Sequence, residues 1–325
     1  MNTTHNVSDV TLTQIREAHD RIRDKVHRTP VVTSETLSAL AGAQLFFKCE
    51  NLQKIGAFKA RGAANAVFSL SDEAAQHGVA THSSGNHAAA LARAARLRGI
   101  PAYIVMPKNS PKAKEDSVKR QGGKIEFCEP TIQAREATAA RVVAETGAAF
   151  VHPYDNVDVI AGQGTATLEL MEDIPSLDVI LCPVGGGGLI SGTAIAAKGL
   201  EPGIRIIGVE PIGADDAYRS FKSGALQNVA NPETIADGLR GKLSERTFAL
   251  IQKHVDDIIP VSEASIIQAM RSIWEVLKIV VEPSGAVAYA ALIDGKVEAK
   301  GLRIGIILTG GNLDLDELPW AKAQS

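Results

Sequence analysis

Residues 179–190 of the chain read Val-Ile-Leu-Cys-Pro-Val-Gly-Gly-Gly-Gly-Leu-Ile. The apolar run from Val179 to Pro183 predicts a buried strand, and the glycines predict a turn into a helix that begins near Leu189. Glycine lets the backbone approach an anion closely, and a helix N-terminus offers unpaired N–H groups and a positive dipole end. The stretch therefore predicts a phosphate-binding loop, although the loop alone does not identify the phosphate. The loop consists of Gly185, Gly186, Gly187 and Gly188.

Strands and helices alternate on both sides of this stretch. The sequence predicts strands at 44–50, 80–82, 102–106, 124–128, 204–210 and 302–308. It predicts helices at 11–26, 59–70, 112–121, 134–146, 263–277 and 285–292, and two more that follow His87 and Leu189. Such alternation requires crossover connections, so we predict an α/β fold with parallel-rich sheets flanked by helices.

The composition argues against several classes of protein. The 325 residues carry a formal net charge of −3 and contain no basic tract, so the electrostatic footprint of a nucleic-acid binder is missing. The N-terminus lacks the pattern of a signal peptide and no segment reaches the apolar length of a membrane span, so we expect a cytoplasmic protein without a membrane partner. Cys49, Cys128 and Cys182 are widely spaced, which fits neither a disulfide framework nor a metal-binding pair, and we expect Cys49 and Cys182 to be buried thiols.

A nucleotide-binding oxidoreductase is an alternative interpretation of the glycine loop. The next predicted strand ends at Glu210, near the place where a dinucleotide-binding fold puts its ribose-binding acid. However, Ile190 stands where the third glycine of the dinucleotide fingerprint belongs, and the Gly-Lys-Ser/Thr ending of an ATP-binding loop is absent.

Two further segments carry groups that suit an active site. The first segment consists of Ser83, Ser84, Gly85, Asn86 and His87. It lies at a predicted strand-to-helix turn, where hydroxyls, an amide and free N–H groups suit a carboxylate, but an ordinary helix cap with a solvent-facing histidine fits equally well. The second is Lys59 in Gly56-Ala-Phe-Lys-Ala-Arg-Gly62, where a lone lysine at a helix start is usually just solvated.

Together these segments resemble the fold type II pyridoxal-phosphate enzymes, specifically the group of serine/threonine dehydratases, 3-hydroxyaspartate dehydratases and serine racemases. The resemblance runs from Arg28-Thr-Pro30 to Thr309-Gly-Gly-Asn312. It implies a two-lobed fold similar to the β subunit of tryptophan synthase. Residues 1–75 and 150–325 would form a large cofactor-binding domain, and residues 76–149 a small mobile domain that closes over the substrate.

The resemblance also implies a role for each segment. Lys59 would hold pyridoxal 5'-phosphate as a Schiff base, Phe58 would pack near its ring, and Asn86 would bind its phenolic oxygen. Thr309 would face the pyridine nitrogen, and the glycine loop would bind the phosphate. Ala57 departs from the serine that is common before the Phe-Lys pair, so any contact through that hydroxyl is lost. The substrate would be held by Ser83, Ser84, Gly85, Asn86 and His87.

The implied reaction is a β-elimination on serine, threonine or 3-hydroxyaspartate. The products would be a 2-oxo acid and ammonia. Lys59 would take the Cα proton, because the amine freed from the cofactor is poised over Cα. Ser84 matches the serine of serine racemases, where it exchanges a proton on the opposite face of Cα. Serine racemase with a side elimination activity therefore stays an alternative.

Further expectations concern metal, substrate and assembly. Glu210, Ala214 and Asp216 match the divalent-metal site of the racemase subgroup, since two carboxylates and a backbone carbonyl suit Mg²⁺, Ca²⁺ or Mn²⁺. Without the resemblance, the sequence alone would predict that Glu210 and Asp216 are two acidic side chains exposed to solvent. Arg135 and Arg240 are candidates for binding a second substrate carboxylate, with ordinary surface arginines as the alternative. The resemblance also implies a homodimer.

Overall fold

The structure, a computed structural model, describes residues 10–83, 85–110 and 112–321, and two sheets organise them. The larger sheet contains β1 (Val31–Thr33), β2 (Gln44–Cys49), β7 (Val179–Pro183), β8 (Arg205–Pro211), β9 (Asp257–Val261) and β10 (Arg303–Leu308). The smaller sheet contains β3 (Val79–His82), β4 (Ala102–Pro107), β5 (Lys124–Cys128) and β6 (Ala149–Phe150).

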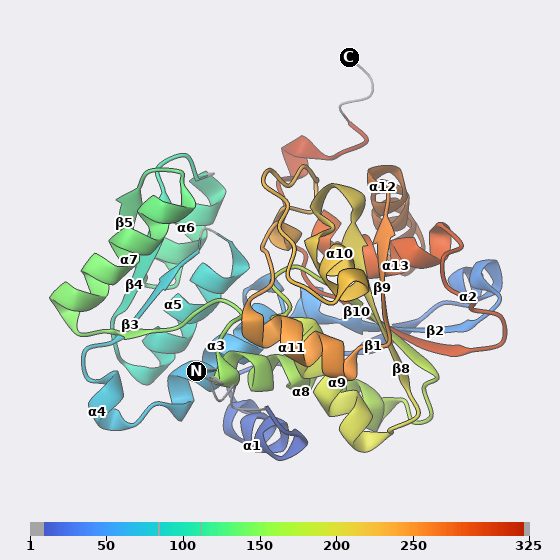
Figure 1. Ribbon diagram of the computed structural model, residues 1–325, viewed down its shortest axis with the longest axis horizontal. Coiled ribbons are helices and arrows are strands. Elements are labelled where there is room, and N and C mark those ends of the chain that lie inside the picture. Colours follow the sequence, from blue (N-terminus) through green and yellow to red (C-terminus); the bar gives the residue numbers. More distant parts are fainter. Residues whose placement is uncertain (1–9, 84, 111, 322–325) are drawn as a thin grey trace.

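Both sheets are dominated by parallel pairing. The strand order of the larger sheet is β1-β2-β10-β7-β8-β9, and its neighbouring strands are parallel except β1 and β2. The order of the smaller sheet is β5-β4-β3-β6, with parallel pairs throughout. Parallel neighbours need crossover connections, which the helices supply (Figure 1). The predicted α/β fold is confirmed.

The helices that were predicted begin and end close to their observed positions, but in the described residues the helices at 35–41, 72–75, 157–173, 216–223 and 245–254 were not predicted. The helices are α1 (Leu12–Ile22), α2 (Glu35–Ala41), α3 (Lys59–Ser69), α4 (Asp72–Ala75), α5 (Asn86–Arg98), α6 (Lys112–Arg120), α7 (Ile132–Thr146), α8 (Val157–Asp173), α9 (Gly188–Leu200), α10 (Asp216–Ser223), α11 (Glu245–His254), α12 (Glu263–Ser272) and α13 (Pro283–Ile293). The predicted helix 263–277 is α12 followed by a π-helical turn, Ile273–Leu277. The sequence pattern gave no sign of α8, because this helix is buried all round from Val159 to Leu170 and has no polar face.

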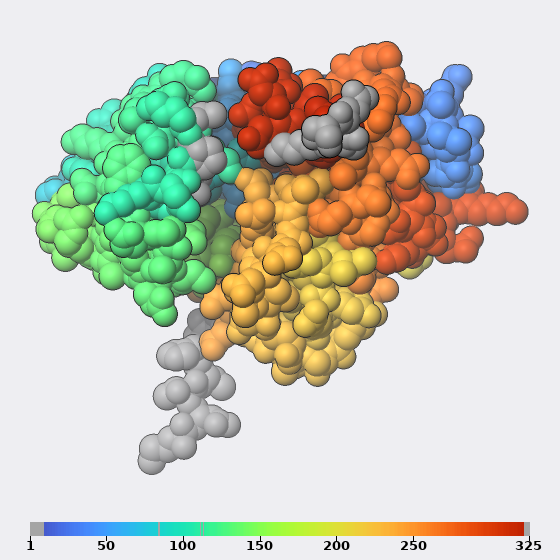
Figure 2. All heavy atoms as spheres, turned by 90° about the horizontal axis from the view of Figure 1, so that it is seen from above, coloured from blue at the N-terminus to red at the C-terminus, as the bar shows by residue number. Residues whose placement is uncertain are grey.

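The two sheets lie side by side with α3 and α8 between them. Figure 1 shows the smaller sheet with α5, α6 and α7 on one side of the molecule and the larger sheet on the other. In Figure 2 the green atoms around the smaller sheet form one half of the surface, and the yellow and orange atoms belong to the other half. Ala63 and Val67 of α3 and Val159 of α8 belong to the hydrophobic core of the smaller sheet.

Helices α3, α8 and α9 approach one another at backbone distance. A Cβ added at Gly162 of α8 would lie 2.6 Å from the Cα of Gly62 in α3. A Cβ at Gly192 of α9 would lie 2.5 Å from the carbonyl oxygen of Ile160 in α8. Only glycine fits at these crossings, so α8 fixes the position of α3 and of its first residue, Lys59.

A buried cluster of charges, here called the Arg61 cluster, joins α3 to its neighbours. Arg61 Nε donates to Glu50 Oε2 at 2.7 Å, and Arg61 Nη2 donates to Glu169 Oε2 at 2.7 Å. Lys48 Nζ donates to the same carboxylate of Glu169 at 2.8 Å. All four side chains are buried. Burying charges is unfavourable unless they are paired and hydrogen-bonded, and here the pairs connect α3 to α8 and to the turn after β2.

The structure bears on two other expectations. The three cysteines are buried and unpaired, and burial raises the pKa of Cys49 and of Cys182 to about 12. Among the described residues, no helix has the length and apolar character needed to cross a membrane.

The Arg61 cluster makes a prediction about stability. In Arg61→Ala, Glu50 and Glu169 stay buried without this counter-charge, so we expect the free energy of unfolding to fall by about 3–5 kcal/mol. Urea titration followed by circular dichroism measures this loss. Arg141, which pairs with Glu126 and Glu145 at the surface, is the matched control, and Arg141→Ala should cost less than about 1 kcal/mol. Similar losses in the two variants would contradict the importance of the buried cluster.

Candidate active site

The predicted site residues follow the carboxyl ends of strands in both sheets. Gly185 follows β7, Thr309 follows β10, and Ser83 follows β3. In open α/β sheets, ligands bind beyond the carboxyl ends of the parallel strands. The residues that the sequence placed in one site are therefore at the edge of each sheet where a site is expected.

Lys59 opens α3 and has an unusual environment. Its Nζ donates to the backbone carbonyl of Pro153 at 2.8 Å and lies 5.0 Å from the ring centre of Phe58. The surrounding protein withdraws the amine from water, which lowers the pKa of Lys59 to about 8. The Phe58 N–H donates to the Thr309 carbonyl at 3.0 Å, so Thr309 lies beside this lysine. A lysine with a lowered pKa can act as a nucleophile or a base near neutral pH.

The glycine loop has room for backbone atoms only. A Cβ at Gly186 would lie 2.4 Å from the Tyr154 ring, and one at Gly187 would lie 2.8 Å from Leu243. Gly187 also has a φ of 86°, in the left-handed region that favours glycine. Since α9 begins at Gly188, the loop runs directly into the N–H groups of a helix start. This geometry fits the predicted phosphate site.

The segment before α5 is placed close to Lys59. The Ser83 hydroxyl accepts a hydrogen bond from the Gly85 N–H at 3.3 Å, and Asn86 begins the helix. His87 is buried rather than solvent-facing. Burial, and next the charge of Lys59, lower its pKa well below the ordinary value, so it is neutral. Ser84 lies outside the described residues.

Thr309 is buried, and its hydroxyl donates to the Ser284 carbonyl at 3.3 Å. This bond ties the residue that follows β10 to the first turn of α13. The hydroxyl is therefore held by α13, while the backbone carbonyl of the same residue accepts from the Phe58 N–H.

The structure adds residues that the sequence did not assign to the site. Tyr154 covers the glycine loop, and its neighbour Pro153 accepts from Lys59. Glu282 is buried and accepts from Asn86 Nδ2 at 3.0 Å. Burial, and next the charge of Asp237, raise the pKa of Glu282 to about 8. Glu282 directly precedes Pro283 at the start of a helix, and this pattern could have marked it as a candidate. The sequence around Tyr154 contains no comparable pattern.

The predicted metal ligands form a buried group. Glu210 ends β8, and its carboxylate accepts from Ala217 N at 3.1 Å and Tyr218 N at 2.8 Å. Burial, and next the charge of Asp216, raise the pKa of Glu210 well above its ordinary value, and burial raises the pKa of Asp216 to about 6. Ala214 lies in the short turn between them. The two acids are thus buried, not the solvated pair that the sequence alone suggested.

No cluster of three or more His, Cys, Asp or Glu side chains in the described part of the chain could hold a metal ion. The predicted set contains only two such side chains, and its third ligand would be a backbone carbonyl.

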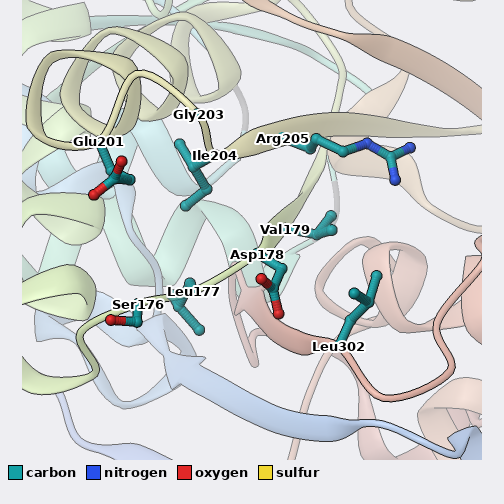
Figure 3. A pocket seen from close by; sticks show the side chains of 9 residues that line it. All are labelled: Ser176, Leu177, Asp178, Val179, Glu201, Gly203, Ile204, Arg205 and Leu302. Atoms are coloured by element: carbon teal, nitrogen blue, oxygen red, sulfur yellow. The ribbon is translucent and has the colours of Figure 1, made fainter.

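A separate pocket lies at the opposite edge of the larger sheet (Figure 3). Its lining includes Asp178, Arg205 and Leu302, at the amino ends of β7, β8 and β10. Asp178 already accepts from the Arg303 N–H at 2.8 Å. None of the predicted site residues lines this pocket. The candidate active site is distinct from it, because its residues lie at the carboxyl ends of the strands.

Comparison with known proteins settles the family. The family model described as "Pyridoxal-phosphate dependent enzyme" matches residues 22–310. The chain belongs to this family. The predicted resemblance is confirmed, and the oxidoreductase alternative is removed.

Individual members of the pyridoxal-phosphate family are similar over nearly the whole chain. The chain is 54% identical over 303 residues to the beta-hydroxyaspartate dehydratase of Paracoccus denitrificans, covering 93% of this chain and 96% of the relative. It is 52% identical over 316 residues to the serine racemase of Arabidopsis thaliana, covering 96% and 95%. The solved structure of maize serine racemase matches with a TM-score of 0.93 and 48% identity, covering 97% of each chain.

The described residues fit the cofactor of this family. Lys59 supplies an amine of lowered pKa, and the glycine loop supplies a cradle that a Cβ would fill. Phe58 and Thr309 lie beside the lysine, where a ring would be held. Pyridoxal phosphate could therefore be bound through its aldehyde, its phosphate and its ring at once.

The lowered pKa of Lys59 makes a prediction about cofactor capture. In the cofactor-free protein, the rate constant for capture of pyridoxal phosphate should rise with pH and level off above about 8, because Lys59 loses its proton there. Stopped-flow absorbance measures this rate, and Lys59→Ala should abolish the visible band. A rate that keeps rising to the pH of an ordinary lysine would contradict the assigned environment.

Proposed function

We propose that this pyridoxal-phosphate enzyme is an ammonia-lyase that dehydrates and deaminates a small β-hydroxy-α-amino acid, with 3-hydroxyaspartate as its preferred substrate. The products are a 2-oxo acid and ammonia. The similarity to a beta-hydroxyaspartate dehydratase supports this reaction. The observation that carries the substrate preference is the unpaired guanidinium of Arg135.

Arg135 lies near the candidate active site without a carboxylate partner in the described part of the chain. It is half-buried on α7, and its Nε is buried with no hydrogen-bond partner. The pKa of His82, the last residue of β3, is lowered first by burial and next by the positive charge of Arg135, so the two side chains are near each other. An unpaired guanidinium binds a carboxylate with two parallel hydrogen bonds. Arg240, the other candidate, is exposed and donates to the Thr234 carbonyl at 2.6 Å, so Arg135 is the better partner for a second substrate carboxylate.

The chain's own residues supply binding and proton transfer. When bound, pyridoxal phosphate would accept the electrons of the Cα–H bond. Lys59 Nζ would take the Cα proton, since an amine whose pKa is about 8 is partly neutral and still basic near neutral pH. Ser83, Gly85, Asn86 and the N–H groups that open α5 would hold the α-carboxylate and so direct Cα toward the lysine.

Domain motion and assembly complete the proposal. Residues 76–149 would form the small domain that closes over the substrate and excludes water. Their separate four-stranded sheet supports this division, and an ion pair between Lys114 of α6 and Asp237 joins the two sides. A homodimer is proposed from the family resemblance, and the cytoplasmic location stays a proposal that rests on the sequence pattern.

Serine racemase is the second candidate activity. The similarity to a plant serine racemase and the presence of Ser84 favour it. Ser84 would exchange the second proton at Cα, while the lysine acts on the other face. A modest interconversion of L- and D-serine would accompany the elimination.

Arg135 gives the decisive test of the substrate. A panel of L-serine, D-serine, L-threonine and the 3-hydroxyaspartate isomers would be assayed for 2-oxo acid release. In Arg135→Gln, kcat/KM for 3-hydroxyaspartate should fall about tenfold to a hundredfold, the value of a charge-assisted hydrogen bond, and that for serine should change little. Arg240→Gln is the matched control and should behave like wild type. Equal losses on both substrates would reject Arg135 as the second carboxylate site, and no elimination from any substrate would reject the function.

We also propose that Glu210, the Ala214 carbonyl and Asp216 bind Mg²⁺, with Ca²⁺ or Mn²⁺ as substitutes. A cation would relieve the repulsion between two buried carboxylates. After chelation, Mg²⁺ should raise the thermal midpoint, since a ligand at about 100 times its Kd stabilises the folded state by about 2.7 kcal/mol. Differential scanning fluorimetry measures the shift, which Asp216→Asn should abolish. A wild-type protein that responds to neither chelator nor Mg²⁺ would remove the metal site.

A further inference from the structure

Asn86 is held from both sides by residues whose backbones belong to the larger-sheet side of the molecule. Asn86 Nδ2 donates to Glu282 Oε1 at 3.0 Å. Asn86 Oδ1 accepts from Asn312 Nδ2 at 2.9 Å. Glu282 precedes α13 and Asn312 follows β10, whereas Asn86 begins α5 next to the smaller sheet. These three residues, here called the Asn86 triad, therefore bridge the two sheets beside Lys59.

The orientation of the Asn86 carboxamide follows from one backbone group. Asn312 Nδ2 also donates to the carbonyl oxygen of Ile55 at 2.7 Å, and a carbonyl oxygen can only accept. The amide nitrogen of Asn312 must therefore lie at this end, and its other N–H faces Asn86. The atom of Asn86 that receives this N–H must be its oxygen. The nitrogen of Asn86 is then directed to Glu282, and one of its two N–H groups is left over.

Glu282 maintains this orientation from the other side. Its Oε1 accepts from Asn86, and its Oε2 accepts from the backbone N–H of Asn312 at 3.2 Å. Both oxygens serve as acceptors when Glu282 is ionised, which burial delays until the pH exceeds its pKa of about 8. A glutamine at this position could offer only one acceptor, and the backbone N–H of Asn312 would compete for it.

Close packing prevents the Asn86 triad from shifting. A Cβ added at Gly310 would lie 2.4 Å from Glu282 Oε1, and one at Gly56 would lie 2.5 Å from Asn312 Oδ1. Gly56 has a φ of 72°, which favours glycine independently. The carboxyl and carboxamide groups therefore have little freedom to exchange places.

We propose that Glu282 and Asn312 are positioning residues that make Asn86 present an N–H group, and not its carbonyl oxygen, to the phenolic oxygen of pyridoxal phosphate. The phenolic oxygen carries negative charge when it is ionised. A donor stabilises that charge, and an inverted carboxamide would repel it. The inference rests on the family's cofactor and on the assignment of Asn86 to its phenolic oxygen, not on the identity of the substrate.

The test measures cofactor binding in the absence of substrate. Glu282→Gln keeps the size of the side chain but replaces one acceptor by an amide N–H, which faces either Asn86 Nδ2 or the backbone N–H of Asn312, so it should let the Asn86 carboxamide invert. We expect the Kd for pyridoxal phosphate to rise about tenfold to a hundredfold. We also expect the visible band of the bound cofactor to lose intensity to a form that absorbs at shorter wavelength, because the neutral phenol is favoured. Absorbance titration of the cofactor-free protein at about pH 9, where Glu282 is ionised, gives both quantities.

Two comparisons separate positioning from simple structural support. Asn86→Ala removes the N–H donor but places no oxygen against the phenolic oxygen. Glu282→Gln should therefore raise the Kd for pyridoxal phosphate at least as much, although Glu282 contacts the cofactor only through Asn86. Glu275→Gln makes the same exchange at an exposed side chain that pairs with Arg271, and it should leave both quantities unchanged. A Glu282→Gln protein with the wild-type Kd and spectrum would overturn the proposal, and so would an equal spectral change in Glu275→Gln.

A second variant covers the case in which Glu282→Gln does not fold. The Asn312 side chain is exposed, so Asn312→Ala should leave the fold intact. It removes the N–H that fixes Asn86 Oδ1, while Glu282 still holds the other end. The Kd and the spectrum should then change in the same direction by a smaller factor, and no change would overturn the proposal. Failure of the substrate panel would reject the proposed activity without altering these measurements.

Discussion

The position of Lys59, the lysine that we propose as the reacting group, depends on the buried Arg61 cluster. Arg61 lies two residues after Lys59 in α3, and its guanidinium is paired with Glu50 and Glu169. Charges that are removed from water tolerate few arrangements, because each must keep its partners and its hydrogen bonds. Helix α3 can therefore neither slide nor rotate without leaving a buried carboxylate unpaired. This electrostatic constraint places the Lys59 amine against the backbone of Pro153.

The sequence predicted the features that local patterns encode. The strand at 179–183 and its glycine loop were recognised because a short apolar run and consecutive glycines are visible within a dozen residues. Helix α8 was missed because a helix that is buried on all faces has no amphipathic period. The contact of Glu282 with Asn86 joins residues that are far apart in the chain, and no local pattern encodes it. Family resemblance supplied the roles of the site residues, but it did not supply the partners that orient them.

One stretch of chain, residues 234–243, touches several functional parts of the molecule. The N–H of Leu243 donates to Asp216 Oδ2 at 3.2 Å, in the group that we assign to the metal. At the other end of the stretch, Asp237 forms an ion pair with Lys114 of α6. The proposed metal site and the contact between the two sides of the molecule are thus connected through a single short segment. A cation at Asp216 would therefore lie next to the segment that carries Asp237, the partner of Lys114.

The glycine crossings of α3, α8 and α9 have a consequence for how such enzymes diverge. They hold the Lys59 amine on a scaffold that tolerates almost no change, since a single methyl group at Gly162 would collide with the backbone of Gly62. Arg135, which we assign to substrate choice, projects from α7 beside the other sheet. If Lys59 and Arg135 have the proposed roles, the reaction and the choice of substrate depend on different sides of the molecule. A substitution on the smaller-sheet side would then exchange the amino acid that is consumed and leave the surroundings of the lysine unchanged.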